Sequence, residues 1–301
     1  SGKIYSNVLQ KERKGEYLGA TIQVIPHVTN EIKRFINSNL NDEDIVIYEI
    51  GGTVGDIESL PFLEAIRQIR NDRKISSSLI HMTYVPYISS AGELKTKPTQ
   101  HSVKDLLNAG IQPDIIMCRC EKKIDSEALK KISLFCNVKK ENVIPALNAD
   151  SIYKVPSLYS QAGLDKALLN ELGFDEKKYP LNLEPWNKVV DRDNESKKIV
   201  KVSVVGKYTD LKDSYKSLNE ALIHGGIYNH SKVDIKWINA EKLDVNQIKK
   251  KLENTNGILV PGGFGERGVD GKIASIKFAR EKNIPFFGIC LGMQLAVIEI
   301  A

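Results

Sequence analysis

The sequence lacks long apolar runs and is poor in cysteine. No stretch approaches the ~20 apolar residues that a membrane-spanning helix needs, and the first residues show no secretory signal. Four cysteines are too few for a disulfide framework, and Cys118-Arg119-Cys120 lacks the spacing of a zinc or redox motif. These absences favour a cytoplasmic protein with no membrane partner.

The sequence also lacks a strong excess of charge of either sign. Its 43 Lys and Arg against 38 Asp and Glu give a formal net charge of +5, and the basic residues are dispersed. Short clusters such as Lys249-Lys250-Lys251 are typical of a solvated helix face, so we expect no nucleic-acid partner. An anionic small molecule such as a nucleotide fits as well, because its site needs only a few well-placed lysines.

What the sequence does have is a repeated alternation of apolar strands with amphipathic helices. Near-continuous apolar runs, such as the strand expected at Asp44–Ile50, are typical of parallel sheets, so the pattern predicts an α/β fold. The 301 residues suffice for two domains. The amino-acid composition changes over residues 174–198, which contain two prolines and a charged run. We therefore predict a first domain at residues 1–173, a linker at 174–198 and a second domain at 199–301.

The second domain contains a cysteine in a setting that favours reactivity. Cys290 separates an apolar strand-like run from a helix-like run, and Gly288 and Gly292 allow a sharp turn there. A thiol at a helix N-terminus meets unpaired N–H groups, which lower its pKa into the range of roughly 3.5–7.5 and can hold an oxyanion. The Gly-rich turn after the strand at residues 257–260 would bring the Gly263 N–H to the same sheet edge. The alternative is an inert cysteine in the core.

Two loops of the first domain indicate a nucleotide site. Glu49 ends an apolar run, and two more carboxylates lie among three glycines in residues 51–59, a pattern typical of a Mg²⁺-nucleotide site. In the second loop, Lys95 and Lys97 would point to one side if the segment is extended, which suits a triphosphate. Gln100 would then read a base or ribose edge. The alternative for the first loop is a charged turn after a strand, and the alternative for the second is a solvated lysine pair.

Several motifs carry a resemblance to known families. Pro-Gly-Gly-Phe-Gly (261–265) followed by Gly-Ile-Cys-Leu-Gly-Met-Gln (288–294) resembles the class I glutamine amidotransferases, in which the cysteine attacks the glutamine amide and releases ammonia. Residues 51–62, 95–103 and 205–208 resemble, in this order, the CTP synthase family. The resemblance covers essentially the whole chain. It implies a P-loop-type amidoligase domain with a parallel sheet, followed by a flavodoxin-like amidotransferase domain, both incomplete.

The resemblance also implies substrates and residue roles. ATP and Mg²⁺ would phosphorylate the 4-oxygen of UTP, and ammonia from glutamine would displace the phosphate to give CTP, with GTP as an activator, CTP as an inhibitor and a homotetramer as the assembly. The nucleophile would be Cys290, and the glutamine and oxyanion contacts Gly263, Leu291, Gly292, Met293 and Gln294. The Mg²⁺ ligand would be Glu49, and the ATP contacts Leu147, Asn148 and Ala149. The UTP and CTP contacts would be Asp56, Ile57, Glu58, Lys95, Thr96, Lys97, Pro98, Thr99, Gln100 and Lys131.

Two parts of the family pattern are not in the 301 residues. No Gly-x-x-x-x-Gly-Lys-Ser/Thr phosphate loop occurs, and all five histidines precede Cys290, whereas the family's triad takes its His and Glu from downstream. We therefore expect no CTP formation by this polypeptide alone. Two alternatives stay open: a non-catalytic assembly or regulatory piece, and an amidotransferase with a different synthetase, against which the motifs at 51–62 and 95–103 count.

Overall fold

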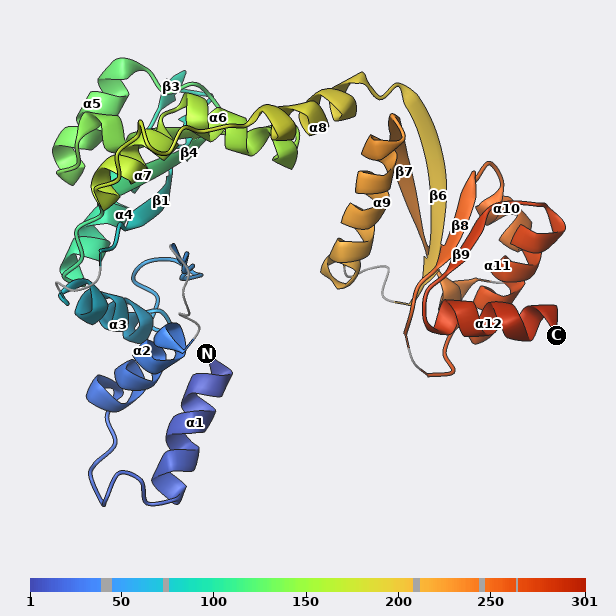
Figure 1. Ribbon diagram of the computed structural model, residues 1–301, viewed down its shortest axis with the longest axis horizontal. Coiled ribbons are helices and arrows are strands. Elements are labelled where there is room, and N and C mark those ends of the chain that lie inside the picture. Colours follow the sequence, from blue (N-terminus) through green and yellow to red (C-terminus); the bar gives the residue numbers. More distant parts are fainter. Residues whose placement is uncertain (39–44, 73–75, 208–211, 244–246, 264) are drawn as a thin grey trace. The chain divides into compact units, whose positions relative to one another are not determined.

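The computed structural model describes residues 1–38, 45–72, 76–207, 212–243, 247–263 and 265–301 (Figure 1). The chain divides into two compact units, Ser1–Asn182 and Leu183–Ala301. Across the described ranges, every helix is too short or too polar to cross a membrane.

The first unit is built on a parallel sheet of three strands, in the order β1 (Ile80–Tyr84), β4 (Ile115–Cys120) and β5 (Val143–Leu147). Side chains of β4 alternate between two cores, as expected for a strand buried on both faces. One core lies against α4 (Lys97–Asn108) and α5 (Ser126–Cys136), and the other against α6 (Val155–Gln161) and α7 (Leu164–Leu172). The sheet is therefore covered on both faces, and the predicted α/β class is confirmed.

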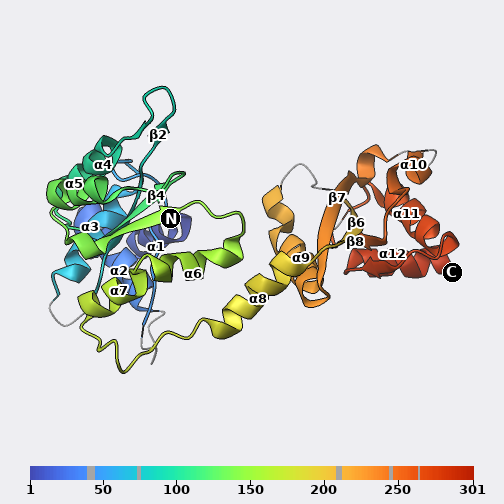
Figure 2. The ribbon, with the colours of Figure 1, turned by 90° about the horizontal axis from the view of Figure 1, so that it is seen from above.

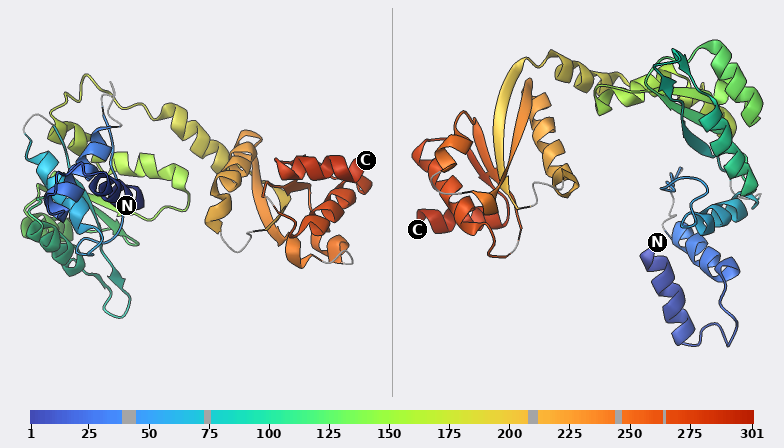
Figure 3. Two further views of the ribbon diagram at one scale, coloured as in Figure 1. Left: turned by 90° about the horizontal axis from the view of Figure 1, so that it is seen from below. Right: turned by 180° about the vertical axis from the view of Figure 1, so that it is seen from behind.

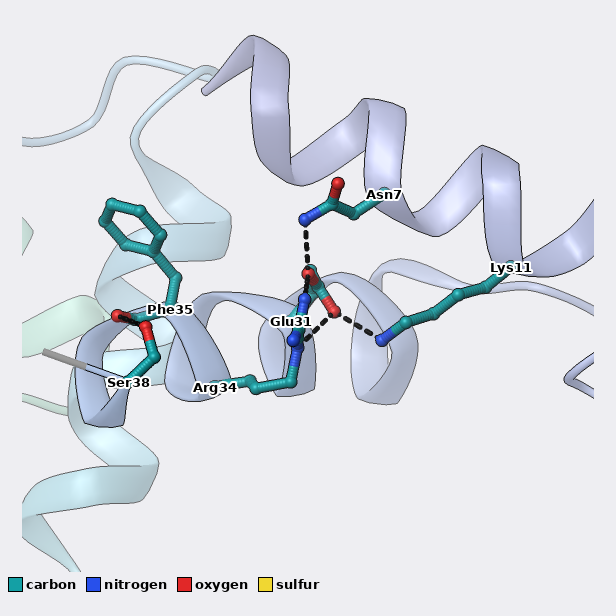
Figure 4. A network of polar contacts seen from close by, with 6 residues as sticks. All are labelled: Asn7, Lys11, Glu31, Arg34, Phe35 and Ser38. Atoms are coloured by element: carbon teal, nitrogen blue, oxygen red, sulfur yellow. Dashed lines mark hydrogen bonds and ion pairs between the residues drawn. The ribbon is translucent and has the colours of Figure 1, made fainter.

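A group of helices precedes the sheet. The helices α1 (Gly2–Arg13), α2 (Thr29–Asn37) and α3 (Leu60–Arg70) share an apolar core that includes Ile4, Ile32 and Ala65. Figure 4 shows that α1 and α2 are also joined by the buried carboxylate of Glu31. It accepts hydrogen bonds from Asn7 Nδ2 at 2.8 Å, from Lys11 Nζ at 2.6 Å and from the Arg34 guanidinium.

The second unit is built on a parallel sheet of four strands in the order β7-β6-β8-β9. The helix α9 (Lys216–Tyr228) covers one face, and α11 (Val269–Glu281) and α12 (Leu291–Ile300) cover the other, as Figures 2 and 3 show from two further sides. The strands are β6 (Lys198–Gly206), β7 (Ser231–Asn239), β8 (Gly257–Val260) and β9 (Phe286–Gly288).

The remaining described elements of the two units are short or lie outside the two main sheets. They are the hairpin strands β2 (Tyr87–Ile88) and β3 (Glu93–Leu94), the helices α8 (Glu184–Glu195) and α10 (Ile248–Leu252), a π-helical turn at Val24–Val28, and 3₁₀ turns at Lys140–Asn142, Ile152–Lys154, Lys212–Tyr215 and Ala240–Lys242.

Two local predictions are wrong. Residues 45–50 form no strand, and Ile47 is 90% exposed, because no neighbouring strand among the described residues pairs with this apolar run; Asp44 lies outside the described residues. The segment around Lys97 is helical rather than extended, since Pro98 in the first turn favours the start of α4. Residues 184–195 of the predicted linker form α8, and the proposed domain limits stay a prediction.

Candidate functional site

The most distinctive local geometry in the second unit is the turn at Cys290. This residue joins β9 to α12 with φ 51° and ψ −110°, a conformation that costs a residue other than glycine about 1–3 kcal/mol. The turn is held by hydrogen bonds from Ile289 N to Val260 O (3.0 Å) and from Gly292 N to Ile289 O (2.9 Å). Cys290 is exposed. The neighbouring strand thus holds the thiol at the surface in a strained conformation, and the alternative of a cysteine buried in the core is excluded.

Three glycines make this turn sterically possible. A Cβ at Gly292 would come within 2.0 Å of Val260 O, and one at Gly288 would lie 2.6 Å from the carbonyl carbon of Gly292. A Cβ at Gly262 would lie 3.3 Å from the Cβ of Cys290 and 3.9 Å from its sulfur. The sequence analysis missed the contact at Gly262, although the Gly262-Gly263 doublet was a signal for it. The Gly-rich turn after β8 therefore packs directly against the thiol residue.

Backbone N–H groups beside the thiol are available for a developing negative charge. The carbonyl of Cys290 accepts hydrogen bonds from the N–H groups of Met293 and Gln294, at 3.1 Å each. In the part of the chain that the structure describes, the N–H of Leu291 has no such partner. Gly263 follows in the adjacent turn, with φ 140°. The oxyanion contacts expected from Leu291 and Gly263 stay predictions.

Two lysines lie near the Gly-rich turn: Lys207, which belongs to the motif at residues 205–208, and Lys272, for which the sequence pattern predicted no role. Lys207, at the end of β6, is buried and donates to the carbonyl oxygen of Gly265 at 2.7 Å. Lys272, in the first turns of α11, is fully buried, and its pKa is lowered by this burial and by the charge of Lys207. The two lysines place positive charge close to the turn that contacts the thiol.

The second unit supplies no histidine on the side of the sheet where the thiol helix packs. Of its histidines, His224 belongs to α9 and His230 follows that helix, and α9 lies on the face of the sheet opposite α12 (Figure 1). His224 therefore lies away from the face that carries the thiol helix, and the role of Cys290 as a nucleophile stays a prediction.

The predicted nucleotide loop of the first unit forms the end of the β2–β3 hairpin and the first turn of α4. The Lys95 N–H is bonded to Pro86 O at 2.9 Å, and the side chains of Lys95 and Lys97 are exposed. An ion pair joins Lys95 to Glu93, and the hydrogen bond from Lys95 holds the pKa of Glu93 below its usual value. Lys131, which is exposed on α5, also lowers that pKa through its charge. Lys95 and Lys131 thus lie around one point of the surface.

Two threonines of this loop turn inward instead. Thr96 is buried and accepts a hydrogen bond from Gln100 Nε2 at 3.1 Å. Thr99 is fully buried, and its hydroxyl donates to Thr83 Oγ1 at 3.0 Å and lies 3.3 Å from Tyr84 O. The exposed lysine side chains of the loop are therefore open to solvent, whereas the buried threonine side chains bond to other residues of the first unit.

The other predicted residues lie in separate loops of the first unit. Asp56, Ile57 and Glu58 are exposed in the loop before α3, and the Asp56 carboxylate accepts the Thr53 N–H at 3.1 Å. The predicted ATP contacts lie at the end of β5 and directly after it, where the Asn148 N–H is bonded to Cys120 O at 3.0 Å; Leu147 and Asn148 are exposed and Ala149 is half-buried.

A groove of about 2470 Å³ runs along the first unit beside β1. Of the predicted nucleotide and metal residues, Glu49 and Pro98 are the ones that line it, together with residues of β1 such as His81 and Thr83. Over the described ranges, no three His, Cys, Asp or Glu side chains come together as metal ligands.

Comparison with known proteins identifies both units. The family model described as "CTP synthase N-terminus" matches residues 1–174, and the one described as "Glutamine amidotransferase class-I" matches residues 210–301. Among relatives, the CTP synthase of Paramagnetospirillum magneticum is 56% identical over 303 residues, covering 100% of this chain and 56% of the relative. That of Rhizorhabdus wittichii is 57% identical over 302 residues, covering 99% of this chain and 55% of the relative.

A solved structure also matches part of the chain. The glutaminase domain of Trypanosoma brucei CTPS, with bound acivicin, is 44% identical and covers 33% of this chain and 39% of that one, with a TM-score of 0.32. The chain spans little more than half the length of the relatives it matches. It contains a CTP synthase N-terminal domain and part of a class I amidotransferase domain, each with a parallel sheet. Because the first family model alone accounts for more than half of its 301 residues, the chain belongs to the CTP synthase family.

Proposed function

We propose that the protein containing this chain is a glutamine-dependent ligase that uses ATP to aminate UTP to CTP. The observation that carries the proposal is the presence of both family segments in one chain, with an exposed thiol at a strained turn in the second. A synthetase segment joined to an ammonia-releasing segment is what such a reaction requires.

The geometry around Cys290 supports the ammonia-releasing half. The thiolate attacks the side-chain amide carbon of glutamine, and the carbonyl oxygen becomes an oxyanion that the N–H groups of Leu291 and Gly263 stabilise. When the C–N bond breaks, the nitrogen takes a proton and leaves as ammonia, and water hydrolyses the remaining thioester to glutamate. The base that takes the thiol proton is not among the described residues. The exposed Met293 and Gln294, and the buried Gly292, complete the proposed glutamine contacts.

The first unit supports nucleotide binding through its exposed lysines. Lys95, Lys97 and Lys131 offer positive charge for the triphosphate of UTP or of the inhibitor CTP, beside Pro98 and the half-buried Gln100. Because the side chains of Thr96 and Thr99 are buried, we propose that these two residues contact the nucleotide through backbone atoms. The exposed Asp56, Ile57 and Glu58 are the proposed further CTP contacts, and Leu147, Asn148 and Ala149 the proposed ATP contacts.

The metal, the activator and the assembly rest on family membership. We assign the carboxylate of Glu49 as one candidate Mg²⁺ ligand, which would act together with the phosphates of the nucleotide. Activation by GTP and a homotetrameric assembly are proposals of the same kind.

The test is CTP formation from UTP, ATP and Mg²⁺, measured once with ammonia and once with glutamine as the nitrogen source. We expect the full-length protein to be active with both, its Cys290→Ser variant to be active with ammonia alone, and the 301-residue chain to form no CTP. Full-length protein that is silent with both nitrogen sources would overturn the proposal. Glutamine-dependent turnover by the 301-residue chain would overturn the assignment of an external base.

A further inference from the structure

The strand β1 has polar side chains in its interior positions. His81 and Thr83 are 7% and 6% exposed, whereas the alternate residues Ile80, Met82 and Tyr84 are at least 38% exposed. In a strand covered by a helix, the inward positions are usually apolar, because burying a polar group costs free energy unless it is hydrogen-bonded. Polar groups in these positions therefore need partners on the element packed against them.

Each of these side chains has a partner on α4, and Thr83 Oγ1 also donates to Cys118 Sγ on β4 at 3.9 Å. Thr83 Oγ1 accepts the hydrogen bond from Thr99 Oγ1 at 3.0 Å, and His81 Nε2 lies 2.8 Å from Ser102 Oγ. The spacing is two residues along the strand and three along the helix, which keeps the members of each pair on one face of their element. The strand and the helix are thus joined by two polar bonds about one helical turn apart.

The first of these bonds lies within the proposed UTP-binding segment. Thr99 is flanked by the exposed Pro98 and the half-buried Gln100, yet its own side chain is fully buried and directed at β1. Its hydroxyl lies within hydrogen-bond distance of Thr83 Oγ1 and Tyr84 O, and both of these atoms belong to β1. The position of the first turn of α4 therefore depends on the strand residue beneath it.

We propose that Thr83 is a positioning residue for UTP: its hydroxyl, bonded to Thr99, fixes the first turn of α4 so that Lys97 and Gln100 face the nucleotide. His81 and Ser102 form a second anchor one turn further along the helix. Thr83 contacts no nucleotide itself and acts through Thr99. This inference rests on the proposed binding of UTP by residues 95–100 and adds a strand residue that the motif does not contain.

The test is the ammonia-dependent formation of CTP by the full-length protein, because that reaction does not need the thiol. The variant Thr83→Val keeps the shape of the side chain and removes the hydroxyl, and we expect it to raise KM for UTP about tenfold, the equivalent of about one net hydrogen bond. KM for ATP and kcat should stay within about twofold of the unmodified protein. The matched control Thr83→Ser keeps the hydroxyl and should restore KM for UTP.

Three other results would contradict the role of Thr83 or the function on which it rests. An unchanged KM for UTP in Thr83→Val, or equal losses in both KM values and kcat that follow the loss of thermal stability, would reduce Thr83 to an ordinary core residue. If Thr83→Val does not fold, Ser102→Ala at the outer anchor takes its place, and the inference then requires KM for UTP to rise while KM for ATP does not. An unmodified protein that forms no CTP would overturn the proposed function and this inference with it.

Discussion

The four cysteines differ in what surrounds each sulfur. Burial raises the pKa of Cys118 to about 12 and that of Cys136 to about 11, and it also raises the pKa of Cys120. Cys290 alone of the four is exposed. Because alkylation requires an accessible thiolate, we expect iodoacetamide at neutral pH to modify one cysteine per native chain and four after denaturation.

Mass spectrometry of the labelled chain checks this expectation. The Cys290→Ser variant should take up no label in the native state and three after denaturation. Rapid native labelling of that variant would show that the buried cysteines are more accessible than the structure indicates.

The buried carboxylate of Glu31 predicts a dependence of stability on pH. The hydrogen bond from Arg34, followed by those from Lys11 and Asn7, lowers its pKa from 4.5 to about 2 against the opposing effect of burial. A lowered folded-state pKa means that the stabilisation is complete above about pH 4.5 and is lost as the pH falls towards 2. We expect Glu31→Gln to lower the free energy of unfolding by about 1.5–3 kcal/mol at pH 7 and to remove part of this pH dependence.

Urea unfolding at several pH values measures the effect. Glu12→Gln on the exposed face of α1 is the matched control and should change the free energy of unfolding by less than about 0.5 kcal/mol. Some acid sensitivity should persist in Glu31→Gln, because the pKa of Glu64 is also lowered to about 2, mainly by Arg67. A pH profile identical to that of the unmodified chain would rule out the proposed role of Glu31.

At the scale of elements, the β9–α12 connection depends on the absence of a side chain at one residue. A Cβ at Gly292 would come within 2.0 Å of the Val260 carbonyl oxygen, and both groups belong to backbone that cannot easily move. We expect Gly292→Ala to destabilise the second unit by about 3 kcal/mol, at the upper end of the usual cost of overpacking. Thermal unfolding monitored by circular dichroism gives the measurement.

A second glycine, at which alanine is expected to stabilise the chain, is the control. A Cβ at Gly225, which is exposed on α9, would meet nothing within 4 Å. Gly225→Ala should therefore stabilise the helix by about 0.5–1 kcal/mol, through the lower backbone entropy of alanine in the unfolded chain. Equal effects of the two substitutions would contradict the close approach of α12 to β8.

Elements whose apolar pattern matches their burial were predictable from sequence. The strand expected at residues 257–260 is β8, and its residues Ile258, Leu259 and Val260 are buried. The strand expected at residues 45–50 was not predictable in the same way, because a strand forms only where a neighbour pairs with its backbone. The start of α4 at Lys97 is consistent with Pro98 in its first turn, but the hydrogen bond that joins this turn to β1 is not evident from local sequence.

At the scale of the whole molecule, each compact unit has apolar cores of its own. The core of the second unit includes Val205, Ile258 and Leu295, and the cores of the first unit contain none of its residues. We therefore expect calorimetry of the 301-residue chain to show two unfolding transitions. Glu31→Gln should lower the temperature of one and Gly292→Ala that of the other. A single transition that both variants shift equally would contradict this independence.

The fold class and the family follow from sequence alone, because they depend on local patterns: apolar runs, glycine positions and the motifs at residues 51–62, 95–103 and 288–294. Only the tertiary structure decided which side chains of those motifs are exposed. It turned Thr99 away from the surface towards Thr83, and it brought Gly262 against Cys290. The physical reason is that burial and hydrogen bonding depend on residues far apart in the chain, which packing alone brings together.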